Sequence, residues 1–263
     1  MSDREASGSE FKNPRVQALR RLLADRTERR HTGLFVVEGP TSTVEAVRSG
    51  ARCLTQFVPI GSDAAVDGAG DVVELAEGVL ERLGSTVRPQ PPLTVVESVR
   101  HDVTNVLAHA SFVVMLDRVG DPGNLGTIMR SAEAAGADAV VLTPGSVDPY
   151  NPKVVRSSAG AIFHVPVSEA TFDDVVAGGL RLVGTSSHAF PDRTVARYTD
   201  ADLTGRIALV MGNEAAGLPD EWNDEVGPIG RWVTIPHAGR TESLNVAMAA
   251  TVLAFEAARQ RSV

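Results

Sequence analysis

The chain has 263 residues, of which 43% are hydrophobic, so it can form one large domain or two small ones, each with its own core. No uncharged apolar run of about 18 or more residues is present, which argues against a membrane span. Residues 1–12 lack the apolar stretch of a signal peptide and are expected to be a disordered lead-in. A single cysteine, Cys53, excludes an internal disulfide or a cysteine-based metal site, so we expect a cytoplasmic protein without bound metal.

The net charge of −8 at first argues against a nucleic-acid partner, but the basic residues are unevenly distributed. Residues 11–31 contain seven basic side chains against two acidic ones. Arginine binds phosphate through a planar fork and stacks on bases, so this region is a candidate nucleic-acid surface. A solvated amphipathic helix explains the same run equally well. The candidate contacts are Arg15, Arg20, Arg21, Arg29 and Arg30.

The first half, residues 13–104, reads as a small α/β domain. Helical periodicity over residues 16–29 is followed by a short buried strand at 34–38. Gly39-Pro40 ends that strand, and Thr41 or Ser42 could cap a helix through residue 47. Further strands are predicted at 53–59, 72–75 and 93–96, with a loop at 61–71 and a helix at 77–83. Residues 105–111 are expected to be a linker to the second half.

The second half, residues 112–263, alternates strands with helices. Residues 112–116 form a continuous apolar run, typical of a strand covered on both faces. A loop at 117–126 leads into a helix through about residue 135. Strands are predicted at 139–142, 181–184, 207–211 and 231–235, and a closing amphipathic helix at 244–259. This alternation favours a parallel sheet with helices on both faces.

Three glycine-containing loops follow predicted strands, where ligands bind in open α/β sheets. The first loop carries Asn124, Gly126 and Arg130, without the G-x-G-x-x-G spacing of a dinucleotide site. By itself it could be a helix cap formed by Asn124 with a surface arginine.

The second loop is Gly-Asn-Glu, which sets the carboxylate of Glu214 at a strand end beside flexible backbone. The third brings Ser243 and Asn245 to the start of the last helix. Taken singly, the second could be a surface turn, and in the third Thr241 or Ser243 could simply cap that helix.

Together these loops closely resemble the SpoU (TrmH-like) family of RNA ribose methyltransferases over residues 112–259. The motif Asn-x-Gly-x-x-x-Arg is matched by Asn124, Gly126 and Arg130, and Gly-x-Glu-x-x-Gly-hydrophobic by residues 212–218. The third motif is matched by Ile-Pro at 235–236, Gly239 and Ser-Leu-Asn-Val at 243–246. His237 departs from the family's frequent Met, and Ala247 from its frequent Ser. Residues 33–47 resemble the L30e-like RNA-binding domain that precedes many such catalytic domains.

The resemblance implies S-adenosyl-L-methionine as cofactor, a deep trefoil knot in the C-terminal α/β domain, and a homodimer whose active site is completed across the interface. The cofactor would bind in the knotted loops. Its expected contacts are Thr185, Ser186, Met211, Gly212, Gly217, Ile235 and Leu244.

By the same resemblance, Arg130 is the catalytic arginine, which we expect to clamp a phosphate and stabilise the developing alkoxide. Asn124 and Asn245 would hold Arg130 or the ribose, Ser243 would hold its loop, and Glu214 would organise the second loop. The expected reaction is methylation of a ribose 2′-hydroxyl in ribosomal RNA, with tRNA as the alternative substrate. A non-catalytic RNA-binding module acting in ribosome assembly is the alternative of another class.

Overall fold

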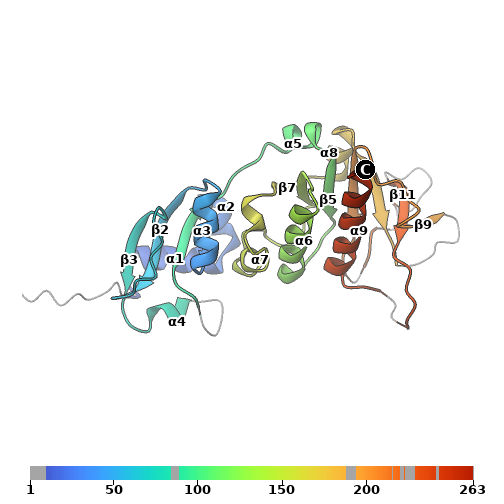
Figure 1. Ribbon diagram of the computed structural model, residues 1–263. Coiled ribbons are helices and arrows are strands. Elements are labelled where there is room, and N and C mark those ends of the chain that lie inside the picture. The colour runs from blue at the N-terminus through green and yellow to red at the C-terminus, as the bar shows by residue number, and fades with distance from the viewer. Residues whose placement is uncertain are drawn as a thin grey trace, which may run out of the picture. The chain divides into compact units, whose positions relative to one another are not determined.

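The computed structural model of the chain describes residues 10–83, 89–187, 194–214, 216–219, 222, 229–240 and 243–262 (Figure 1). The predicted lead-in falls mostly outside these ranges. Two compact units are present, one of Met1–Val99 with Asp148–Phe163, the other of Arg100–Val147 with His164–Val263. The first unit therefore includes a segment that we had assigned to the second domain. Among the described helices, none has the length and apolar character to cross a membrane.

The first unit is built on a four-stranded sheet in the order β1-β4-β2-β3. Strand β4 (Leu93–Glu97) is antiparallel to β1 (Leu34–Glu38) and to β2 (Cys53–Pro59), and β3 (Asp71–Leu75) is parallel to β2. All four strands were predicted to within two residues at each end. Alternate side chains of a strand point to opposite faces, so the sheet buries two separate clusters.

Helices cover both faces of this sheet. On one face, α1 (Pro14–Ala24) and α4 (Val79–Leu83) pack against Val36, Phe57 and other apolar side chains. On the opposite face, Phe35 and Val37 pack with α3 (Pro40–Arg48) and with Val155 of α7 (Pro152–Ser157). The segment around α7 thus completes the core of the first unit, although it lies more than 50 residues further along the chain than β4.

The single helix predicted over residues 16–29 is wrong, because the chain forms two helices, α1 and α2 (Arg26–Thr32). Asp25 between them is extended, with φ −117° and ψ 117°, and its carboxylate accepts a hydrogen bond from the amide of Thr27 at 2.7 Å. This is an N-cap, which starts a new helix. Gly39, with φ 88°, precedes α3, so neither Thr41 nor Ser42 caps that helix.

A buried ion pair lies inside the first unit. The Arg29 side chain, of which only 4% is exposed, places its Nε 2.7 Å from Oδ2 of Asp148, at the start of the inserted segment. Its Nη1 also donates to the carbonyl oxygen of Leu22 at 2.6 Å. The prediction that Arg29 binds RNA is therefore wrong, because its guanidinium is buried and already bonded to Asp148 and to the Leu22 carbonyl. A second pair, Arg156 with Glu38, joins α7 to β1.

The second unit contains a seven-stranded sheet in the order β7-β6-β5-β10-β8-β11-β9, in which every neighbouring pair is parallel. This confirms the predicted parallel sheet. The strands are β5 (Phe112–Leu116), β6 (Ala139–Leu142), β7 (Val167–Glu169), β8 (Arg181–Thr185), β9 (Val195–Arg197), β10 (Ile207–Met211) and β11 (Ile229–Thr234). The short edge strands β7 and β9 were not predicted. The deep trefoil knot stays a prediction from the family resemblance.

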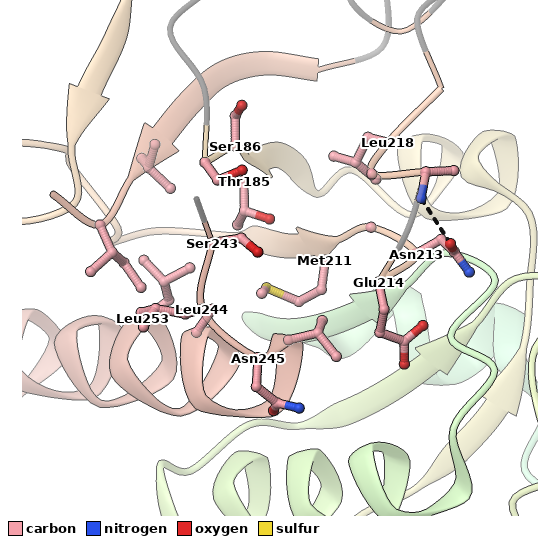
Figure 2. Close-up of a pocket in the computed structure, with 18 of the residues that line it drawn as sticks. Thr185, Ser186, Met211, Asn213, Glu214, Leu218, Ser243, Leu244, Asn245 and Leu253 are labelled. Atoms are coloured by element: carbon pink, nitrogen blue, oxygen red, sulfur yellow. Dashed lines mark hydrogen bonds between the residues drawn. The ribbon is translucent and has the colours of Figure 1, made fainter. Parts of the chain in front are cut away.

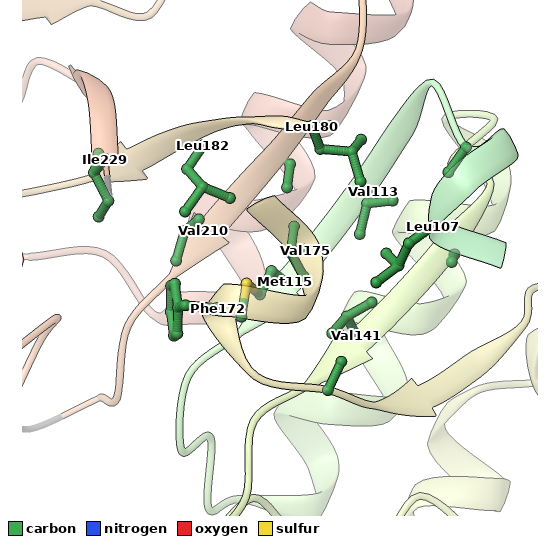
Figure 3. Close-up of a cluster of buried hydrophobic side chains, with 14 of the residues drawn as sticks. Leu107, Val113, Met115, Val141, Phe172, Val175, Leu180, Leu182, Val210 and Ile229 are labelled. Atoms are coloured by element: carbon green, nitrogen blue, oxygen red, sulfur yellow. The ribbon is translucent and has the colours of Figure 1, made fainter. Parts of the chain in front are cut away.

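Helices cover both faces of the central strands. On one face, α5 (Val103–His109) and α8 (Phe172–Ala177) contribute Leu107 and Val175 to a cluster with Met115 and Val210 (Figure 3). Residues 105–111 are therefore not a free linker, because α5 occupies most of them. On the opposite face, α6 (Pro122–Ala134) and α9 (Val246–Arg261) lie side by side (Figure 1), joined by the hydroxyls of Ser131 and Thr251 at 2.7 Å.

Candidate active site

A cavity of about 520 Å³ lies at the carboxyl ends of the neighbouring strands β10, β8 and β11, beside the start of α9. This is the edge of a parallel sheet at which ligands bind. The structure brings to its wall all seven residues expected to contact the cofactor. These are Thr185, Ser186, Met211, Gly212, Gly217, Ile235 and Leu244. Glu214, Ser243 and Asn245 line it as well (Figure 2).

A tight turn after β10 shapes one wall of the cavity. The amide of Asn213 donates to the carbonyl oxygen of Gly217 at 3.1 Å, and the amide of Gly217 donates to the carbonyl oxygen of Asn213 at 2.9 Å. A Cβ added to Gly212 would lie 2.5 Å from the carbonyl carbon of Gly217, so only glycine fits at position 212. Asn213, which was not predicted as a site residue, also donates from Nδ2 to the carbonyl oxygen of Arg118 at 2.8 Å.

Hydrogen bonds join one residue from each of the three loops. Nδ2 of Asn245 donates to Oδ1 of Asn124 at 3.0 Å, and Nδ2 of Asn124 donates to Oε1 of Glu214 at 2.9 Å. An ionised carboxylate only accepts hydrogen bonds, so it fixes which way the Asn124 amide points. We call this chain the Asn–Asn–Glu network. It connects positions 90 and 121 residues apart in the sequence.

Helix caps position two members of the network. Asp121 is the N-cap of α6 and accepts from the amide of Asn124 at 2.8 Å, so Asn124 lies in the first turn rather than at the cap. Asn245 is the N-cap of α9, accepting from the amides of Ala247 and Met248. The expectation that Ser243 could cap this helix is wrong, and Thr241 lies outside the described residues.

The cavity wall combines apolar and hydroxyl side chains. Leu244, Leu253 and Met211 offer apolar surface, and Thr185 and Ser243 offer hydroxyls (Figure 2). A concave, mostly apolar site with a few fixed polar groups is typical of a binding site for a small organic molecule such as a nucleoside.

Two side chains in the described wall are ionisable, Glu214 and His237. Nε2 of His237 is buried and has no hydrogen-bond partner among the described residues. From the sequence, His237 was noted only as a departure from the family's frequent Met. Nothing in its local sequence signals that it lines the cavity.

The arginines predicted as site residues do not line the cavity. Arg130 is exposed on α6 and does not line the cavity. It lies six residues after Asn124, which at about 100° per residue turns it about 120° away around the helix axis. Within one chain the structure therefore does not bring Arg130 to the Asn–Asn–Glu network. Arg15, Arg20, Arg21 and Arg30 are exposed on α1 and α2.

Comparison with known proteins identifies relatives of both parts of the chain. A model described as the SpoU rRNA Methylase family matches residues 111–255, and one described as an MRM3-like substrate binding domain matches residues 13–94. The chain is 34% identical over 252 residues to the 23S rRNA (guanosine(2553)-2′-O)-methyltransferase RlmP of Bacillus subtilis (strain 168), covering 93% of this chain and 96% of that protein.

A second relative is the 23S rRNA (uridine(2479)-2′-O)-methyltransferase of Streptomyces viridochromogenes. It is 33% identical over 270 residues, covering 95% of this chain and 91% of that protein. Among solved structures, the SpoU methyltransferase AviRb from Streptomyces viridochromogenes in complex with the cofactor AdoMet aligns with a TM-score of 0.82 at 32% identity. That alignment covers 95% of this chain and 98% of the other.

Proposed function

The chain belongs to the SpoU rRNA methylase family, and we propose that it transfers a methyl group from S-adenosylmethionine to a ribose 2′-hydroxyl of ribosomal RNA. The observation that carries this proposal is the Asn–Asn–Glu network, which joins the three family motifs beside a cavity sized for a nucleoside. A binding module without catalysis would need the cavity, but it would not need three polar side chains from separate loops held against one another.

The residues of the cavity fit S-adenosylmethionine. The absence of a side chain at Gly212 lets the turn close tightly, and Leu244 and Leu253 offer apolar surface to an adenine ring. The hydroxyls of Ser186 and Ser243 can bond to the polar atoms of a nucleoside. When bound, the cofactor supplies an electrophilic methyl group on a sulfonium.

The chain's own residues must orient the ribose hydroxyl and manage its proton. A neutral hydroxyl is a weak nucleophile, and holding it in line with the methyl group removes much of the entropic barrier. Both polar atoms of the Asn124 amide are already bonded, so Asn124 is a rigid element that positions its neighbours. Arginine stays protonated in proteins, so Arg130 would clamp a phosphate and stabilise the alkoxide, while that phosphate or a water molecule accepts the hydroxyl proton.

We propose a homodimer in which Arg130 reaches the cavity of a second copy. Beside the cavity, α9 and the residue that precedes its cap expose a row of large apolar side chains. These are Leu244, Met248 and Phe255, with 38%, 58% and 48% of their surface exposed. Arg130 lies next to Ser131, which contacts α9, so one surface carries both the unpaired apolar row and the arginine that its own cavity lacks. A twofold interface through α6 and α9 would bury the apolar row and place Arg130 at the cavity of the second copy.

Mixing two inactive variants tests this arrangement. If each site takes Arg130 from one copy and Asn124 from the other, heterodimers of Arg130→Ala and Asn124→Ala chains contain one intact site. Random reassociation should then restore about a quarter of the wild-type activity. Activity that stays at the level of the separate variants would contradict a shared site.

The first unit is proposed to bind the substrate RNA. Its sequence matches a substrate-binding domain, and Arg15, Arg20, Arg21 and Arg30 are exposed on two consecutive helices. Exposed arginines bind phosphates without regard to base, which allows a protein of net charge −8 to hold RNA on one local surface. The relatives methylate a guanosine and a uridine in 23S rRNA, so the family leaves the modified base open. We place the reaction in the cytoplasm, where ribosomes assemble.

The direct test supplies tritiated S-adenosylmethionine together with unmodified 23S rRNA or with unmodified tRNA. We expect label in 23S rRNA at a single ribose that resists alkaline cleavage, and none with Asn124→Ala. Label in tRNA alone would identify tRNA, instead of ribosomal RNA, as the substrate. Full binding of cofactor and RNA without any label would instead support the non-catalytic RNA-binding alternative.

A further inference from the structure

Arg118 has an unusual backbone conformation for a residue with a side chain. It lies two residues after β5 and has φ 49°, in the left-handed region that favours glycine. Holding a non-glycine residue there costs free energy, and such residues gather at functional sites. Neither the family motifs nor the Asn–Asn–Glu network uses Arg118.

Two neighbouring segments hold this backbone in place. The amide of Arg118 donates to Oγ1 of Thr143, directly after β6, at 3.0 Å. Its carbonyl accepts from Nδ2 of Asn213, after β10, at 2.8 Å. Because β6, β5 and β10 are adjacent parallel strands, Arg118 stands at their shared carboxyl edge. Asn213 also lines the cavity, so this loop is tied directly to the candidate active site.

The side chain is oriented as well as the backbone. Nε of Arg118 donates to Oδ2 of Asp117 at 2.9 Å, and Oδ1 of Asp117 accepts from Oγ1 of Thr143 at 2.9 Å. The Asp117 side chain is only 4% exposed, whereas that of Arg118 is 46% exposed. The pair is therefore anchored in the protein on the carboxylate side and open to solvent on the guanidinium side.

One edge of the guanidinium remains available. A guanidinium has five N–H donors in a planar fork, and the bond to Asp117 uses the Nε donor. Neither Nη nitrogen has a hydrogen-bond partner among the described residues. Two parallel N–H groups at this end match the geometry of a phosphate. The Asp117 carboxylate offsets part of the guanidinium charge. Arg118 would therefore contribute more by orienting the phosphate than by electrostatic attraction.

We propose that Arg118 is a positioning residue for the substrate, donating its two Nη groups to a backbone phosphate of RNA at the mouth of the cavity. The strained backbone and the buried carboxylate hold the fork ready before RNA arrives, which reduces the entropy lost on binding. This inference rests on the proposed function, because it takes RNA to be the substrate. It assigns the contact to the catalytic unit, separately from the arginines of α1 and α2.

Replacing Arg118 with glycine tests the proposal cleanly. Glycine adopts a positive φ without strain, so Arg118→Gly removes the guanidinium without adding backbone strain. Arg118→Asn is a second variant, since asparagine also tolerates this region. Arg181→Ala is the charge-matched control, because Arg181 starts β8 at the amino edge of the same sheet. The measurements are the Kd for unmodified 23S rRNA over a range of salt, the Kd for S-adenosylhomocysteine, and the melting temperature.

For Arg118→Gly and Arg118→Asn we expect RNA binding about tenfold weaker, as for loss of a hydrogen bond to a charged group. The slope of log Kd against log salt should fall by no more than about one, the value for loss of one phosphate contact, since Asp117 offsets part of the guanidinium charge. The cofactor Kd should not change. Both variants should melt lower than the wild type and by similar amounts, because the buried Asp117 carboxylate loses its charged partner in each. An RNA affinity and salt slope equal to those of Arg181→Ala would overturn the assignment. Absence of methyl transfer by the wild type would instead refute the proposed function, because RNA binding is measured separately.

Discussion

The buried pair of Arg29 and Asp148 gives the sharpest test of how the first unit is assembled. The amide of Tyr150 donates a hydrogen bond to Oδ1 of Asp148 at 3.1 Å. Asp148→Asn keeps the size of the side chain and an oxygen that can accept this bond. It removes the charge that compensates the buried guanidinium. Breaking such a pair by removing one partner costs about 3–5 kcal/mol, a large share of the roughly 5–15 kcal/mol that stabilises a typical domain.

The double variant separates the charge from the packing. Arg29→Met removes the guanidinium but keeps much of its apolar stem, so combined with Asp148→Asn no buried charge is left unpaired. What remains is mainly the lost bond to the carbonyl of Leu22, at about 1–2 kcal/mol. We therefore expect the double variant to be more stable than Asp148→Asn alone. The exposed pair of Arg52 and Glu97 is the control, and breaking it should cost under about 1 kcal/mol.

Urea unfolding followed by two signals locates the loss. Both tryptophans, Trp222 and Trp232, lie in the second unit, so their fluorescence reports on that unit. Far-ultraviolet circular dichroism reports on both units. We expect Asp148→Asn to shift the dichroism transition to lower urea and to leave the fluorescence transition close to the wild-type position. The argument from an uncompensated charge would be refuted if the double variant lost as much unfolding free energy as the two single variants together.

Three further predictions concern the second unit. Gly212→Ala should weaken binding of S-adenosylhomocysteine, measured by calorimetry, by at least about tenfold, because the added methyl group overlaps the backbone of Gly217. Gly230→Ala is the control and should leave binding unchanged, because no atom lies within 4 Å of its new Cβ. His237→Met should raise the unfolding free energy of the ligand-free protein by about 1 kcal/mol in urea titrations, since it removes a buried nitrogen that has no hydrogen-bond partner in the described part of the chain. A lower stability would contradict this. The hydrogen bond from Arg259 holds the pKa of Glu256 below its ordinary value near 4.5, so its contribution to stability is complete above that value and is lost as the pH falls through the lowered pKa. The melting temperature of Glu256→Gln should therefore depend less on pH in acid than that of the wild type. An unchanged pH profile would contradict a stabilising role for the ionised Glu256.

Local patterns were enough to predict most of the secondary structure. The apolar runs at 112–116 and 207–211 are strands β5 and β10, fully buried, because a run of such residues can only be covered on both faces. The three loops were found from residue type and spacing, since glycine and strand-end polar residues are constrained by their immediate neighbours. Where a local signal had two solutions it misled, as at Asp25, where an acidic residue inside an apparent helix is a cap.

The sequence by itself determined most of the elements, the parallel sheet and the family, because these depend on periodicity and on motifs a few residues long. Only the tertiary structure decided which of five similar arginines is buried, since burial of Arg29 requires Asp148, 119 residues away. It also decided that the segment around α7 completes the core of the first unit and that Asn245, Asn124 and Glu214 bond to one another. Contacts of this kind form only when distant segments of the chain pack together, and no local pattern of residues records which partners will meet.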